Sequence, residues 1–216
     1  MGKRKTFEIA WNAAIVVTIF GAVIWYFIPG NVDVIGSTRL RSFRYFTTDS
    51  NLLIALAATI RIIFLLKERH DESLKLPVWF RRLHYAATVA GAVTFFEVLL
   101  FMSPVAMYLG GAKAALGCYR GNVFILHFLA PLMMMLSFVI TDKEYHPTRK
   151  ETIISMLPMM MYGSVYFVMV VVLKAWPDFY KFTFNGRYEM VPIVIIVMFL
   201  GTYAISTLLK KLKATE

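Results

Sequence analysis

The chain has 216 residues, of which 59% are hydrophobic and 17% are charged, and its apolar residues form long blocks separated by short polar connections. This pattern excludes an ordinary water-soluble domain. A net charge of +10 can indicate nucleic-acid binding. Here the basic residues are distributed as membrane topology requires, so we expect no nucleic-acid partner.

Six apolar blocks are long enough to cross a bilayer, because a helix needs about 20 residues to span roughly 30 Å of hydrocarbon. The first block is longer than a signal-peptide core of about 7 to 15 residues, so we interpret it as a retained span. The sequence predicts an all-α polytopic membrane protein, with residues 1–216 forming a single transmembrane domain, a six-transmembrane-helix bundle. The predicted spans lie near residues 7–28, 46–66, 83–102, 121–141, 151–173 and 190–209.

The 23 Lys and Arg residues divide unequally between the two sides of this bundle. Fourteen lie at the termini and in the connections on the same side, eight lie on the opposite side, and Arg61 lies within the second span. Because Lys and Arg are retained on the cytoplasmic face, both termini are predicted to be cytoplasmic, N-in and C-in. We expect Arg61 to extend to the inner interface or to pair with a lipid phosphate. The host membrane is predicted to be a bacterial plasma membrane or the endoplasmic reticulum.

Polar side chains are unfavourable in lipid, so those within predicted spans are the first functional candidates. The second span begins on the outer side with Thr47, Thr48, Asp49, Ser50 and Asn51. On a helix, Thr47, Ser50 and Asn51 share one face, which makes the first turn polar on that side. The alternative explanation is helix capping, since Ser, Thr and Asp at a helix start often bind free backbone amides.

Glu97 and His127 lie at the same depth as this polar turn. The third span runs outward, which places Glu97 in its outer part, and the fourth starts near Asn122 on the outer side, which places His127 about a turn and a half below. A buried histidine is often only a hydrogen-bonded packing residue, with Glu97 as its partner. The coincidence of all three features in one leaflet favours a functional site.

A hydroxyl becomes a nucleophile when a neighbouring base takes its proton, and a neutral imidazole is the usual base. Thr47 and His127 meet this requirement, and Glu97 or Asp49 can orient the imidazole through its far nitrogen. The sequence leaves open which carboxylate does so. The positive end of the second span favours a developing oxyanion near Thr47, and the Asn51 side-chain amide is a candidate donor to it.

Two motifs carry a family resemblance. Residues 44–53 (RYFTTDSNLL) and residues 126–131 (LHFLAP) resemble the androgen-induced protein or ADTRP family of six-span intramembrane threonine hydrolases. The segments Tyr145-His146-Pro147 and Trp176-Pro177 are also similar to family landmarks. The resemblance implies cleavage of fatty acid esters of hydroxy fatty acids, with a threonine nucleophile matched by Thr47 and a histidine matched by His127.

The adjacent Thr48 is the alternative nucleophile. We expect a membrane lipid or fatty-acyl ester as the substrate and no cofactor. The competing hypothesis is a non-catalytic membrane protein that binds or transports a lipid or small molecule. A zinc site at the inner end is a weaker alternative, because no two histidines have ligand spacing on one helix. Its candidate ligands are His70, Glu72, His84, Asp142, Glu144 and His146.

Overall fold

The structure is a computed structural model that describes residues 3–31, 39–68, 71, 73–141, 145–184 and 186–214. The regular elements of these residues are helices, and six stretches are long and apolar enough to cross a membrane. The predicted all-α fold with six spans is confirmed. The six stretches are Lys3–Trp25, Phe46–Lys67, Val78–Gly117, Gly121–Ile140, Arg149–Val172 and Tyr188–Lys213.

Several of these stretches consist of more than one helical element. The α-helices are α1 (Lys3–Trp25), α2 (Phe46–Lys67), α3 (Val78–Glu97), α4 (Ser103–Gly117), α5 (Gly121–Phe124), α6 (Ala130–Ile140), α7 (Arg149–Ile154), α8 (Leu157–Phe167) and α9 (Val191–Ala214). The short π-helical segments, called π-turns below, are η2 (Val98–Met102), η3 (Ile125–Leu129) and η4 (Val168–Val172). The 3-10 helices are η1 (Arg39–Arg44) and η5 (Tyr188–Met190).

The helix that contains the predicted third span extends beyond the predicted limits. Residues 83–102 were expected to form it, but the helix begins at Val78 and continues through η2 and α4 to Gly117. Pro104 does not end it: this proline lies within the continuous helix, directly after the π-turn η2, and membrane helices tolerate a proline where a local π-type adjustment accommodates the lost hydrogen bond. The chain kinks at Gly111, whose φ of 70° is readily available to glycine.

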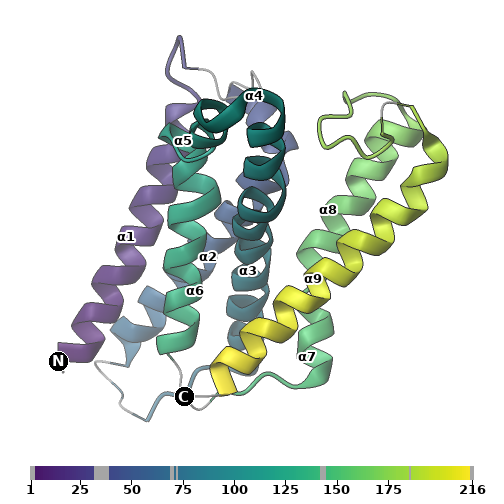
Figure 1. Ribbon diagram of the computed structural model, residues 1–216. Coiled ribbons are helices and arrows are strands. Elements are labelled where there is room, and N and C mark those ends of the chain that lie inside the picture. The colour runs from purple at the N-terminus through teal and green to yellow at the C-terminus, as the bar shows by residue number, and fades with distance from the viewer. Residues whose placement is uncertain are drawn as a thin grey trace.

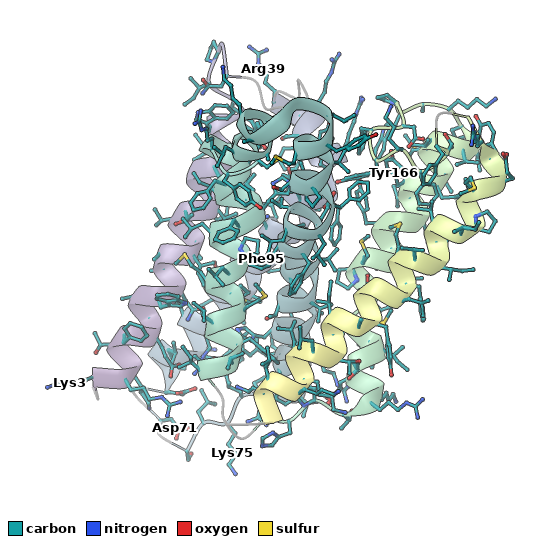
Figure 2. All side chains as sticks on the ribbon, in the orientation of Figure 1. Lys3, Arg39, Asp71, Lys75, Phe95 and Tyr166 are labelled. Carbon is teal, nitrogen blue, oxygen red and sulfur yellow. The ribbon has the colours of Figure 1, made fainter. Side chains whose placement is uncertain are left out.

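Figure 1 shows α1, α2, α3 and α6 side by side, with α4 continuing α3 and the α7–α9 hairpin lying next to α3 and α6. Both chain ends lie at the same end of the bundle, which we call the inner end. Lys3, Asp71 and Lys75 lie at the inner end, and Arg39 lies at the outer end (Figure 2). Six spans and termini at one end agree with the predicted arrangement, in which the inner end is cytoplasmic.

Small residues let α2, α3 and α6 cross closely. A Cβ atom added at Gly91 of α3 would lie 2.6 Å from Cδ1 of Ile54 and 3.6 Å from the Cα atom of Pro131. Small side chains permit such close approach between membrane helices, where dispersion contacts stabilise the pair. The surrounding buried cluster includes Ile15, Ile19, Ala55, Ala57, Ala58, Ala87, Ala130 and Met134. This contact fixes α2 relative to α6.

Polar contacts at the inner end anchor α9 and α2. The Tyr85 hydroxyl of α3 hydrogen-bonds the Ser206 carbonyl and hydroxyl oxygens of α9 at 2.7 and 2.8 Å. Contrary to the expectation, Arg61 does not reach toward a lipid phosphate. It is buried, and its guanidinium donates to Glu8 at 2.6 Å and to Glu68 at 3.3 Å. A buried guanidinium requires such carboxylate partners, so Arg61 joins α1 to α2.

Candidate active site

The first turn of α2 holds Thr47, and no side chain of the polar run at residues 47–51 caps this turn. Tyr45 occupies the N-cap position without a side-chain cap. Its carbonyl accepts the N–H groups of Thr48 and Asp49, and the Phe46 N–H donates to the Tyr180 hydroxyl at 3.1 Å. Capping therefore does not explain the polar run at this helix start. In the described part of the chain, the backbone N–H of Thr47 has no acceptor.

Thr47 and His127 are in direct contact. Oγ1 of Thr47 lies 3.0 Å from Nε2 of His127, although the two residues are 80 positions apart in the sequence. Thr47 is 6% exposed and His127 is partly buried. The expected meeting of a hydroxyl from the second span with an imidazole from the fourth is present.

The other ring nitrogen of His127 defines the tautomer. Nδ1 lies 3.2 Å from the carbonyl oxygen of Val123. A carbonyl oxygen only accepts hydrogen bonds, so Nδ1 carries the proton and Nε2 of the neutral ring is the acceptor. The Thr47 hydroxyl therefore donates to Nε2, which is the arrangement a general base needs.

A carboxylate was expected to orient His127, and the backbone carbonyl of Val123 takes that place instead. Within the described residues, neither Asp49 nor Glu97 hydrogen-bonds the imidazole. Glu97 lies near Tyr180, which belongs to the connection between η4 and η5. Burial raises the pKa of the Tyr180 hydroxyl well above its usual range, and the charge of Glu97 adds to the increase. The role of Val123 has no signature in the sequence, because every residue supplies a backbone carbonyl.

Contrary to the expectation, the Asn51 side chain does not donate to the proposed oxyanion. Its Nδ2 donates to the Thr47 carbonyl and to the Leu126 carbonyl, each at 2.7 Å. These bonds occupy both amide protons. Asn51 therefore ties the turn that carries Thr47 to the turn that carries His127. Ser50 supports the same turn, since its hydroxyl donates to the Thr47 carbonyl at 3.1 Å.

The π-turn η3 explains why the Leu126 carbonyl is available to Asn51. In this turn each N–H bonds the carbonyl five residues earlier, as the Ala130 N–H does with Ile125. The next donor in this register would be residue 131, but Pro131 has no N–H. The Leu126 carbonyl therefore lacks a helical partner, and Asn51 supplies one. The sequence contains Pro131 shortly after His127, but it does not predict the effect of this proline on the register of the helix hydrogen bonds.

The hydroxyls of Thr47 and Thr48 differ in their surroundings. Thr48 is 2% exposed, and in the described part of the chain its hydroxyl makes no hydrogen bond to His127. Residues at i and i+1 of a helix point in directions about 100° apart, so only one of them can face η3. The geometry favours Thr47 over Thr48 as the partner of the imidazole.

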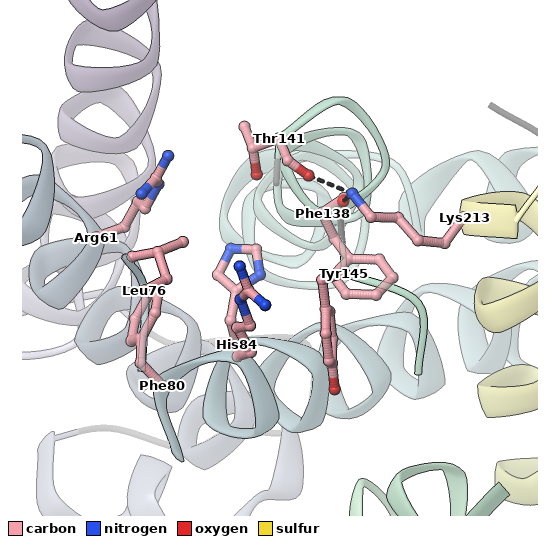
Figure 3. Close-up of a pocket in the computed structure, with 9 residues that line it drawn as sticks. Arg61, Leu76, Phe80, His84, Phe138, Thr141, Tyr145 and Lys213 are labelled. Carbon is pink, nitrogen blue, oxygen red and sulfur yellow. Dashed lines mark hydrogen bonds between the residues drawn. The ribbon is translucent and has the colours of Figure 1, made fainter. Parts of the chain in front are cut away.

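Two cavities lie elsewhere in the molecule. One of about 10 Å³ lies at the inner end, lined by residues that include Arg61, His84 and Lys213 (Figure 3). Lys213 of α9 donates there to the carbonyl oxygens of Phe138, Val139 and Thr141, which end α6. The other, of about 240 Å³, lies between α8 and α9, and Met159, Met160 and Met198 are among its lining residues.

The alternative metal site falls largely outside the residues that the structure describes. Among the described residues, no group of three or more His, Cys, Asp and Glu side chains is arranged to hold a metal ion. His84 is buried against Phe80 and Phe138, with ring centroids 5.8 and 5.9 Å away. Of the other five proposed ligands, His146 lies within the described residues, and His70, Glu72, Asp142 and Glu144 lie outside them.

The fold and the membrane-depth polar contacts define a six-span polytopic membrane protein with a threonine–histidine pair in its outer half. Comparison of the chain with protein-family models, with curated proteins and with solved structures finds no match.

Proposed function

We propose that the protein is an intramembrane hydrolase of lipid esters, such as fatty acid esters of hydroxy fatty acids, in which Thr47 is the nucleophile and His127 the base. The observation that carries the proposal is the 3.0 Å contact between Oγ1 and Nε2, in the tautomer that leaves Nε2 free to accept a proton. The resemblance of residues 44–53 and 126–131 to the androgen-induced protein family supports the same chemistry.

The reaction has two halves. Nε2 of His127 takes the Thr47 proton while Oγ1 attacks the ester carbonyl, which forms a tetrahedral oxyanion. The carbon–oxygen bond to the hydroxy acid then breaks, and the leaving alkoxide takes the proton from Nε2. A water molecule next gives its proton to the same nitrogen and attacks the acyl-threonine, and the fatty acid leaves as Thr47 regains its proton.

Main-chain groups stabilise both charges in this scheme. The Val123 carbonyl accepts a hydrogen bond from the Nδ1–H of His127 and thereby favours the transient imidazolium. The Thr47 N–H at the start of α2 is placed for the oxyanion, because it has no acceptor among the described residues and lies at the positive end of the helix. This donor replaces Asn51 in the mechanism. Acyl chains reach the pair from the surrounding bilayer, either a bacterial plasma membrane or the endoplasmic reticulum.

The decisive experiment measures hydrolysis of a hydroxy-fatty-acid ester by the purified protein and its variants. Thr47→Ala is expected to abolish turnover, and His127→Ala to lower kcat by about 100- to 10,000-fold, the usual contribution of a general base. Thr48→Ala is the matched control and should retain most of the activity. A fluorophosphonate probe should label Thr47 in the wild type.

Equal turnover by the wild type, Thr47→Ala and His127→Ala would end the catalytic assignment. Saturable uptake of a lipid into liposomes without ester cleavage would favour the competing transport function. Probe labelling at Thr48 would move the nucleophile by one residue.

A further inference from the structure

The segment from Leu173 to Arg187, which we call the outer loop, connects η4 to η5 and contains a cluster of aromatic rings. Phe179, Tyr180 and Phe182 pack around Tyr166, which lies at the outer end of α8 (Figure 2). The ring centroids of these three residues lie 4.9 to 5.6 Å from that of Tyr166. Contacts of this kind stabilise the loop beyond simple burial.

This cluster holds the residues that directly precede Thr47. The Tyr180 hydroxyl accepts the N–H of Phe46 at 3.1 Å. Phe179 packs on Tyr45 with centroids 4.4 Å apart, and the Tyr162 hydroxyl of α8 donates to the Arg44 carbonyl at 2.6 Å. Three successive residues before Thr47 are therefore held by a part of the chain more than 100 positions away.

Tyr180 is itself fixed by hydrogen bonds within the loop. Its N–H donates to the Tyr166 hydroxyl at 3.0 Å, and that hydroxyl donates to Oδ1 of Asp178 at 2.9 Å. The Asp178 carboxylate also accepts the N–H groups of Phe182 and Thr183 at 2.7 and 2.8 Å. The phenol that meets α2 therefore has a defined position.

We propose that Tyr180 is a positioning residue, whose hydroxyl holds the first N–H of α2 and thereby sets the separation between Oγ1 of Thr47 and Nε2 of His127. This inference rests on the proposed function. The first turn of a helix lacks intrahelical acceptors for its N–H groups and frays readily. The Tyr180 hydroxyl replaces the missing acceptor one residue before the nucleophile, where a small rotation moves Oγ1 most.

The test uses the full-length protein in a bilayer and the variant Tyr180→Phe, which keeps the ring and removes the hydroxyl. We expect kcat for the hydroxy-fatty-acid ester to fall by about tenfold, because misplacement of a reacting group slows the chemical step. KM should change by less than about twofold, because the group acts on positioning and not on uniform binding.

Tyr85→Phe is the matched control. It also removes a buried tyrosine hydroxyl, but one that bonds Ser206 at the inner end. It should lower thermal stability and leave kcat unchanged. An equal loss of kcat in both variants would reduce the effect to general destabilisation and overturn the proposal.

A second measurement is independent of turnover. The imidazole ¹⁵N spectrum reports whether Nε2 accepts a hydrogen bond, and the chain has 4 histidines, so a His127→Ala spectrum identifies the signal. Tyr180→Phe should shift the Nε2 signal toward that of an unbonded nitrogen, whereas Tyr85→Phe should not. An unchanged signal in Tyr180→Phe refutes the positioning role. A wild type that hydrolyses no ester refutes only the proposed function, because the spectrum still decides the role of Tyr180.

Discussion

One backbone atom selects the neutral tautomer of His127. With the Val123 carbonyl on Nδ1, the ring presents a free Nε2 to Thr47, and no carboxylate is needed for this selection. Asn51 stabilises the contact between Thr47 and His127, because its side-chain amide donates to a carbonyl of α2 and to a carbonyl of η3. At the residue scale the site is built from side chains that contact main-chain carbonyls, and such bonds are strong where water is excluded.

Asn51→Leu is expected to destabilise the protein by about 1 to 2 kcal/mol, because it leaves the buried Leu126 carbonyl without a donor. It should also lower kcat, since α2 and η3 lose their shared bond. Thermal unfolding in detergent and steady-state hydrolysis measure the two effects. Asn12→Leu is the control, because Asn12 is equally buried but, among the described residues, donates to Glu8 alone, one turn away in its own helix. Equal losses in the two variants would contradict the bridging role.

Two spans contain a π-turn that ends just before a proline. Pro131 follows η3 and Pro104 follows η2, each as the second residue after the turn. A π-turn shifts the register of backbone hydrogen bonds, and the proline then leaves one carbonyl without a helical donor. At η3 this carbonyl belongs to Leu126 and binds Asn51. At the scale of elements, the interruption in the fourth span both rotates His127 and provides the anchor for α2.

Pro131→Ala restores an N–H that competes with Asn51 for the Leu126 carbonyl. We expect the variant to fold but to lose about tenfold in kcat, because a relaxed η3 moves the imidazole away from Thr47. The His127 ¹⁵N spectrum and the kinetics measure this change. Pro104→Ala makes the same substitution after η2 and should leave kcat unchanged. Full activity of Pro131→Ala would show that the register shift is not needed for catalysis.

Asp178 makes the stability of the outer loop depend on pH. Burial alone would raise the pKa of its carboxyl, but hydrogen bonds from Thr183, Phe182 and Tyr166 outweigh burial and hold the pKa below its usual value. The resulting stabilisation is present above the unfolded-state pKa of about 3.9 and is lost as pH falls through the lower folded-state pKa. Asp178→Asn should therefore lower the thermal midpoint at pH 7 and converge with the wild type in acid. A difference that persists unchanged to acid pH would contradict this.

At the scale of the whole molecule, polar contacts divide between the two ends of the bundle. The inner end carries the Arg61 ion pairs and the Lys213 bonds that join the helices, and the outer end carries the Thr47–His127 pair beneath the outer loop. The basic residues favour the inner end as cytoplasmic. For the proposed hydrolase, an anchored inner end and a Thr47–His127 pair near the outer end suit a substrate that enters from the outer leaflet.

The chain's 1 cysteine offers a direct test of this orientation. Cys118 lies between α4 and α5 at the outer end and is partly exposed, so a membrane-impermeant maleimide should label it on intact cells or sealed vesicles. Burial raises the pKa of its thiol, so mildly alkaline buffer should speed the reaction. Ser73→Cys in a Cys118→Ser background places a thiol on the exposed inner connection and should react only after permeabilisation. The reverse pattern would invert the topology.

Much of the fold was predictable because span hydrophobicity is a local property. The second, fourth and fifth spans begin and end within two residues of the predicted limits. The helix of the third span is longer than predicted, because it continues through η2 and past Pro104 into α4. Arg61 was misplaced because its carboxylate partners, Glu8 and Glu68, come from two different parts of the sequence.

The sequence by itself determined the class of protein and the depth of Thr47 and His127, because residue count along a span converts directly into height in the bilayer. Only the tertiary structure decided that Thr47 and not Thr48 meets the imidazole, that Val123 orients the ring, and that Asn51 serves as a bridge. These outcomes depend on how far each helix rotates about its own axis. That rotation is set by packing against neighbouring helices, such as the close crossing at Gly91, and no single segment of the sequence contains it.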